Sequence, residues 1–142
     1  RENLKNSNID QSGFSSNTKD ILVRIGNAQS GGQMTAIINA AKELSSVEIG
    51  DVFKVVIPKI EKGDLKFFVI RDLFINFERF KGKISEALLK SNSKIKVGDI
   101  PVLRAMYQND SECLEETLQK MIEKGTLSQK MLDDIKAQQK KG

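Results

Sequence analysis

The sequence IEKGDL at residues 60–65 recurs as IEKGTL at residues 122–127. In both copies an apolar residue and a Glu-Lys pair precede a glycine. Glycine adopts the left-handed conformation just past a helix end without steric cost, and a lysine before it suits the negative end of the helix dipole. The residue after the glycine, Asp64 or Thr126, can cap the helix that follows. The two segments therefore predict corners between consecutive helices.

Apolar residues recur at helical spacing on either side of these corners. The stretches 33–44, 64–80, 112–124 and 127–139 each place such residues on one face at 100° per residue. The stretch 64–80 is apolar on two sides, because Phe68 and Ile75 lie roughly opposite Ile70, Leu73 and Phe74. Such a helix usually packs against more than one neighbour. The pattern predicts a central helix over 64–80.

Two segments allow either a helix or a strand. Residues 19–26 and 50–62 are rich in β-branched side chains, which suits a strand, and Pro58 would interrupt a helix. However, Val52, Phe53, Val56 and Ile60 share one helical face, and no partner strand with alternating polarity is evident. We therefore predict a kinked helix at 50–62 and leave the strand as the alternative.

A second internal similarity relates residues 45–56 to residues 92–103. In each copy a β-branched residue precedes Gly-Asp, at Gly50-Asp51 and Gly98-Asp99, and an apolar stripe follows. Asp99 followed by Pro101 is a helix-start signal. The spacing of 48 residues is near the period of HEAT-type repeats. The sequence thus predicts an all-α fold in a single compact domain of about seven or eight helices, either an irregular bundle or a short HEAT-like array.

The expected organisation is a flexible or loosely docked arm at residues 1–16 and a helical domain at 17–142. No apolar run is long enough to cross a membrane. A single cysteine slightly favours an intracellular compartment, and a sequence that begins at Arg1 leaves a removed leader open.

The composition argues against several catalytic classes. The chain has no histidine and one cysteine, so it cannot build a zinc site of the usual kind, a Ser-His-Asp triad or a Cys-His pair by itself. Cys113 lies among glutamates, whereas a nucleophilic thiolate needs positively charged neighbours. We predict no catalytic residue, cofactor or metal site, and no enzymatic activity.

One glycine-rich stretch resembles the spacing of a phosphate-binding loop. Four residues separate Gly26 from Gly31, but Gly32 and Gln33 occupy the positions where that motif requires Lys and Ser or Thr. An inter-helix turn is the better interpretation, with Gln33 near the start of the next helix.

Charge is concentrated in two places. A lysine-rich segment at residues 79–96 carries most of the positive excess, and acidic residues gather after Asp110 at the start of a predicted helix. Only five of the 23 basic residues are arginine, which argues against base readout in nucleic acid. The candidate partner-binding residues are Arg79, Lys81, Lys83, Lys90, Lys94, Lys96, Glu112, Glu115 and Glu116.

These features lead to three functional hypotheses. We expect a non-catalytic helical interaction module that binds another macromolecule, most plausibly a protein, through its charged surfaces. The first alternative is a secreted helical protein that holds a small apolar ligand. The second is binding to nucleic acid or an anionic lipid surface through the segment 79–96. The sequence leaves the oligomeric state and the identity of the partner open.

Overall fold

The computed structural model describes residues 10–141, with side chains described as far as residue 137. Every regular element in these residues is helical, which confirms the predicted all-α class. The chain divides into two compact units, unit 1 (Arg1–Ser91) and unit 2 (Asn92–Gly142). The predicted arm at 1–16 falls largely on residues 1–9, which lie outside the described residues.

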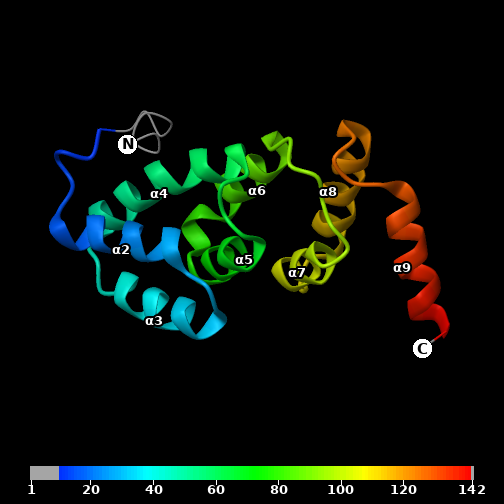
Figure 1. The fold of residues 1–142 in the computed structure, drawn as a ribbon, viewed down its shortest axis with the longest axis horizontal. Helices are drawn as coiled ribbons and strands as arrows, with labels where there is room; N and C mark the ends of the chain where they lie inside the picture. The colour runs from blue at the N-terminus through cyan, green and yellow to red at the C-terminus, as the bar shows by residue number, and fades with distance from the viewer. Residues whose placement is uncertain (1–9, 142) are drawn as a thin grey trace. The chain divides into compact units, whose positions relative to one another are not determined.

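Unit 1 contains five α-helices and one short 3-10 helix among its described residues (Figure 1). They are α2 (Ser16–Asn27), α3 (Gly31–Ala41), α4 (Ser46–Lys62), α5 (Phe67–Asn76), the 3-10 helix η1 (Glu78–Phe80) and α6 (Lys81–Lys90). Each α-helix packs closely against two others, because α2 meets α3 and α4, α6 meets α4 and α5, and α3 meets α5. The contacts therefore form a closed ring.

Both ambiguous segments are helical. Residues 19–26 lie within α2, and Pro58 lies inside α4, so the strand alternative is wrong for both. The helical face recognised in the sequence is the buried one, since Val52, Phe53 and Val56 are almost completely removed from solvent. The burial of this face outweighs the local cost of the proline.

The predicted long helix at 64–80 is broken at Phe77. This residue has φ −125° and ψ 80°, which ends α5 and starts η1. The break brings two rings onto one partner: the Phe80 ring stacks on Phe53 at 4.0 Å between centroids, and the Phe77 ring meets Phe53 edge-on at 5.7 Å. Such aromatic pairs contribute about 0.5–1.5 kcal/mol each beyond their buried area. Tertiary packing therefore overrides the helical period at this position.

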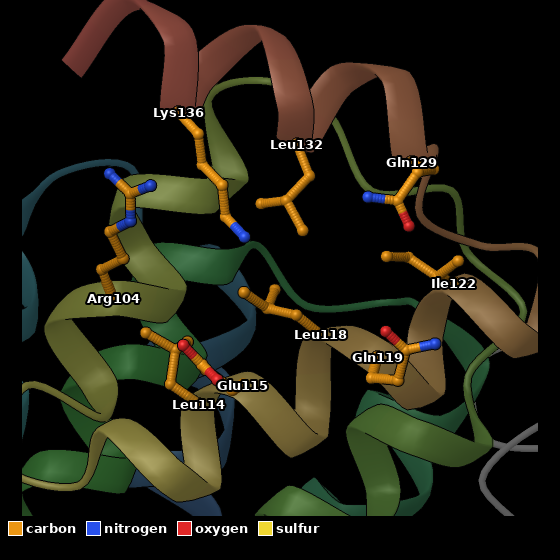
Figure 2. Close-up of a pocket in the computed structure, with 9 residues that line it drawn as sticks. All are labelled: Arg104, Leu114, Glu115, Leu118, Gln119, Ile122, Gln129, Leu132 and Lys136. Atoms are coloured by element: carbon orange, nitrogen blue, oxygen red, sulfur yellow. The ribbon is translucent and has the colours of Figure 1, made fainter. Parts of the chain in front are cut away.

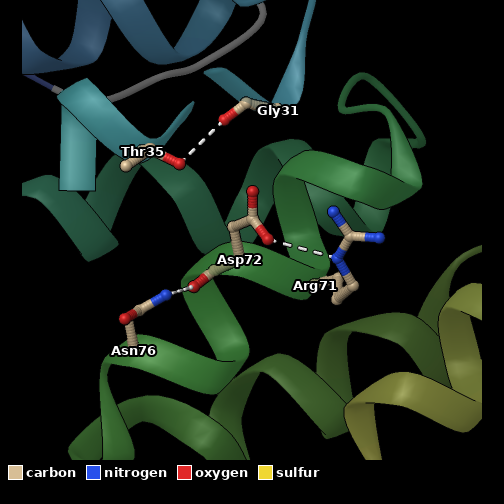
Figure 3. Close-up of polar contacts among 5 residues, drawn as sticks. All are labelled: Gly31, Thr35, Arg71, Asp72 and Asn76. Carbon is tan, nitrogen blue, oxygen red and sulfur yellow. Dashed lines mark hydrogen bonds and ion pairs between the residues drawn. The ribbon is translucent and has the colours of Figure 1, made fainter. Parts of the chain in front are cut away.

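In α5 and in α3, a side chain donates a hydrogen bond to a backbone carbonyl of its own helix. At the end of α5, Asn76 Nδ2 donates to the carbonyl oxygen of Asp72 at 2.8 Å (Figure 3). In α3, the Thr35 hydroxyl donates to the carbonyl oxygen of Gly31 at 3.0 Å. The Asn76 and Thr35 side chains each bond to a carbonyl four residues earlier in their own helix. The outer side of the predicted central helix is only partly covered, since 46% of Ile75 remains exposed.

Unit 2 contains α7 (Asp99–Met106), α8 (Ser111–Lys124) and α9 (Gln129–Lys141). The helix start predicted from Asp99 and Pro101 is confirmed. Gly98 directly precedes α7, whereas Gly50 lies inside α4, so the two Gly-Asp pairs are not equivalent positions. The sequence similarity at a spacing of 48 residues is therefore not a structural repeat.

Both IEKG corners form the predicted glycine turn. Gly63 has φ 77° and Gly125 has φ 92°, both in the left-handed region. The amides of the next residues, Asp64 and Thr126, donate back to Lys59 and Met121. These bonds, with those from the glycine amides, form the Schellman motif that satisfies the last carbonyls of a helix.

The predicted capping role of Asp64 and Thr126 is wrong. The residue before α5 is Lys66, which makes no side-chain cap bond. Before α9, the hydroxyl of Ser128 accepts from the amide of Met131, while the Thr126 hydroxyl donates back to the carbonyl of Met121. Each glycine turn uses the residue after the glycine to close the preceding helix, so the next helix begins further along the chain.

Candidate functional site

The basic segment 79–96 crosses the boundary between the two units, and its unit 1 residues hold structural contacts. Arg79 Nη1 donates to the Ser46 hydroxyl at 3.0 Å, and the guanidinium lies 4.7 Å from the centroid of the Phe80 ring. Lys81 Nζ lies 3.1 Å from a carboxylate oxygen of Glu78. These contacts hold both side chains against unit 1, which restricts how they can meet a partner.

The other two unit 1 residues of the segment differ from each other. Lys90 Nζ lies 3.8 Å from a Glu61 carboxylate oxygen, in a pair that joins α6 to α4. Lys83 is exposed on α6. A solvent-exposed lysine keeps its full hydration and can meet an acidic partner at low cost. Lys83 is thus the better candidate contact of the two.

The unit 2 end of the segment lies beside the α8–α9 corner. Lys94 Nζ donates to the carbonyl oxygen of Gly125 at 3.0 Å, and the Ile95 amide donates to Thr126 at 2.8 Å. The Lys96 backbone amide donates to Asp99 Oδ2, while its side chain is exposed. Lys94 thus secures the corner, and Lys96 extends into solvent.

The acidic cluster caps and lines helix α8. Asp110 precedes α8 and accepts from the amide of Cys113 at 3.0 Å, as expected for a residue at the positive end of a helix. Glu112 is exposed in the first turn, and Glu116 pairs with Lys120 at 3.5 Å. Glu115 lines a pocket between α8 and α9, which the sequence analysis did not identify.

The glycine-rich stretch 26–33 does not form a phosphate loop. Gly26 belongs to α2 and Gly31 begins α3, so only a short turn separates them. Ser30 caps α3 by accepting from the amide of Gln33, and the Gln33 side chain accepts from the amide of Gln29 at 2.6 Å. The turn interpretation is confirmed, with Gln33 in the first turn of α3.

A pocket of about 250 Å³ lies between α8 and α9 (Figure 2). We call it the α8–α9 pocket. Its apolar lining comes from Leu114, Leu118 and Ile122, which follow one another at four-residue spacing on α8, and from Leu132 on α9. Leu118 and Leu132 are buried, while Leu114 and Ile122 are half-buried. The apolar surface that the pocket exposes to solvent therefore comes mainly from Leu114 and Ile122.

Polar side chains edge this pocket unevenly. The long cationic side chains of Arg104 and Lys136 lie at one end, and the amides of Gln119 and Gln129 lie toward the other (Figure 2). Glu115 is the one carboxylate among the described lining residues. With two cations against one anion, the lining carries an excess of one positive charge.

A second hollow of about 420 Å³, larger but more open to solvent, lies along α9. Val97, Met131 and Ile135 form its apolar part, and Val97 is 60% exposed. Its charged lining residues neutralise each other, since Lys130 Nζ lies 3.0 Å from Asp134 Oδ2. This hollow lacks the charge asymmetry that would select one kind of partner.

No metal or membrane feature appears in the part of the chain that the structure describes. These residues contain no group of three or more His, Cys, Asp or Glu side chains placed to hold a metal ion. None of their helices has both the length and the apolar character required to span a membrane.

The described residues form an all-helical fold, and the open α8–α9 pocket in it combines apolar side chains with polar and charged ones. Comparison of the chain with protein-family models, with curated proteins and with solved structures gives no match. A functional assignment therefore depends on the chemistry of the chain itself.

Proposed function

We propose that the protein is a non-catalytic helical interaction module that binds a protein partner. The α8–α9 pocket carries this proposal, because it combines exposed apolar surface with an uneven charged edge. Apolar surface of this kind supplies affinity in protein interfaces, and charge at the rim supplies specificity and speed of association. The absence of histidine and the single cysteine support the non-catalytic part of the proposal.

The charged surfaces contribute through residues that extend into solvent. Lys83 and Lys96 have exposed side chains, whereas Arg79, Lys90 and Lys94 make contacts within the fold. Reversing the charge of the last three would disturb folding as well as recognition. The double variant Lys83→Glu/Lys96→Glu is therefore the cleaner test of a charged contact.

The experiment is affinity capture from the native source with the full chain as bait, followed by reconstitution with each purified candidate. We expect a stoichiometric complex by light scattering, with an affinity that calorimetry shows to weaken as salt increases. The wild-type chain failing to form a stoichiometric complex with any captured protein would contradict the proposal.

The small-ligand alternative receives less support from the dimensions of the pocket. Sites for drug-sized ligands enclose about 300–1,000 Å³ and bury most of the ligand. The α8–α9 pocket has about 250 Å³ and opens to solvent. The hollow along α9 is larger, about 420 Å³, but it is still more open and would bury less of a ligand. The α8–α9 pocket suits side chains from a docking protein better than a whole ligand.

A further inference from the structure

The apolar lining of the α8–α9 pocket follows one helix for most of its length. Leu114, Leu118 and Ile122 lie at successive four-residue steps along α8, which runs from Ser111 to Lys124. A helix of this length extends about 20 Å, or nearly four turns. A second helix laid beside it would meet this stripe with its own residues at three- and four-residue spacing.

The charged end of the pocket determines which sign of charge a partner should place there. Arg104 on α7 and Lys136 on α9 reach the same end from opposite sides (Figure 2). A guanidinium has five N–H donors, so Arg104 can keep contacts within the fold and still face a carboxylate. Glu115 offsets only one of the two charges. An acidic side chain at this end would be favoured over a basic one.

We propose that the α8–α9 pocket receives an amphipathic helix of a protein partner, with an acidic side chain directed toward Arg104 and Lys136. This inference rests on the proposed function and specifies its partner chemistry. Leucine-like side chains of the docking helix enter the pocket between α8 and α9. The neutral amides of Gln119 and Gln129 flank the opposite end, so the charge also sets the direction in which the helix binds.

Two synthetic helical peptides of about four turns provide the probe. Both carry leucines at i, i+4 and i+7, and the residues flanking this stripe are glutamates in one peptide and lysines in the other. Fluorescence anisotropy with the full chain should show about fivefold tighter binding of the glutamate peptide, the size expected from two exposed charge pairs. Increasing salt should reduce the difference.

The variant Arg104→Glu/Lys136→Glu should reverse this preference and bind the lysine peptide more tightly. Lys19→Glu/Lys42→Glu is the matched control, since it changes the net charge equally at exposed residues of unit 1 that lie outside both the pocket lining and the candidate contacts. The control should keep the wild-type preference. Circular dichroism establishes that both variants remain folded.

Several results would overturn the inference. These are no binding of either peptide, equal binding of both, or a preference that the control variant reverses as well. Binding of decanoate that Arg104→Glu/Lys136→Glu abolishes, without peptide binding, would identify a small amphiphile as the ligand. Capture of a native partner that depends on Lys83 and Lys96, but not on Arg104 and Lys136, would support the proposed function and show that the partner does not bind in this pocket.

Discussion

At the residue scale, one carboxylate joins the starts of two helices. Glu48 Oε2 accepts from the hydroxyl of Ser15, the residue before α2, at 2.6 Å. Its other oxygen accepts from the backbone amide of Ser45, the residue before α4, at 2.8 Å. The bond from Ser15 and then the bond from Ser45 lower the pKa of Glu48 below its ordinary value of 4.5. Protonation of this group weakens both bonds.

This lowered pKa predicts a dependence of stability on pH. A carboxyl group with a lower pKa in the folded state stabilises the fold fully above its ordinary value and loses this contribution as the pH falls through the folded-state pKa. Ser15→Ala should reduce stability by about 1 kcal/mol near neutral pH through loss of the α2 cap. Urea unfolding of both proteins from pH 7 to 3 should also show a smaller acid loss for the variant.

A control and a contrary result define this test. Ser16→Ala changes the adjacent exposed serine in α2 and should leave both the stability and its pH profile nearly unchanged. If Ser15→Ala and the wild type lose the same stability between pH 5 and 3, Glu48 does not contribute through Ser15.

At the element scale, the period of apolar residues predicts the helices well, and tertiary contacts explain where it fails. Seventeen residues at 64–80 have one continuous pattern, yet the shared contact of Phe77 and Phe80 with Phe53 ends α5. No local signal marks Phe53 as their partner, because it lies on another helix. In contrast, the Schellman turns at Gly63 and Gly125 depend on local residues and are predictable from the sequence.

The candidate sites show the same division. The acidic start of α8 is predictable, because Asp110 acts on amides within a few residues. The α8–α9 pocket is not, since Arg104, Leu118 and Lys136 come from three helices. The available signal was the four-residue spacing of Leu114, Leu118 and Ile122. A stripe of this kind also describes an ordinary core helix, so the sequence could not separate the two.

Pro58 gives a prediction for helix α4. Proline in a helix interior lacks an amide to donate to the carbonyl four residues earlier, here that of Lys54, and its ring crowds that carbonyl. Pro58→Ala should raise the free energy of unfolding by about 1–2 kcal/mol, after allowance for the greater freedom of alanine in the unfolded chain. Thermal and urea unfolding measure the change.

The exposed position Lys54 supplies the comparison for this variant. Lys54→Ala retains Pro58 and removes only a surface ion pair with Asp51, so it should change stability by less than about 0.5 kcal/mol. A Pro58→Ala protein that is no more stable than the wild type would mean that packing of the half-buried proline ring compensates for the missing bond.

At the scale of the whole molecule, the two units differ in the contacts that stabilise them. The α-helices of unit 1 form a closed ring of contacts, and this unit contains the buried residues Phe53, Val56 and Leu73. Unit 2 has three helices in a much shorter stretch of chain. Small chains bury a smaller fraction of their surface on folding, so their stability is marginal unless another constraint is added.

This difference predicts unequal behaviour of the separated units. A fragment of residues 1–91 should be helical and unfold in one cooperative transition, because its ring of helices and its joined helix starts lie entirely inside it. A fragment of residues 92–142 should show weaker helicity and a broad transition. Circular dichroism during heating tests both fragments against the full chain. A cooperative transition in 92–142 together with an unfolded 1–91 would show that unit 2, and with it the α8–α9 pocket, is the independently stable part. The peptide experiments could then be carried out on that fragment alone.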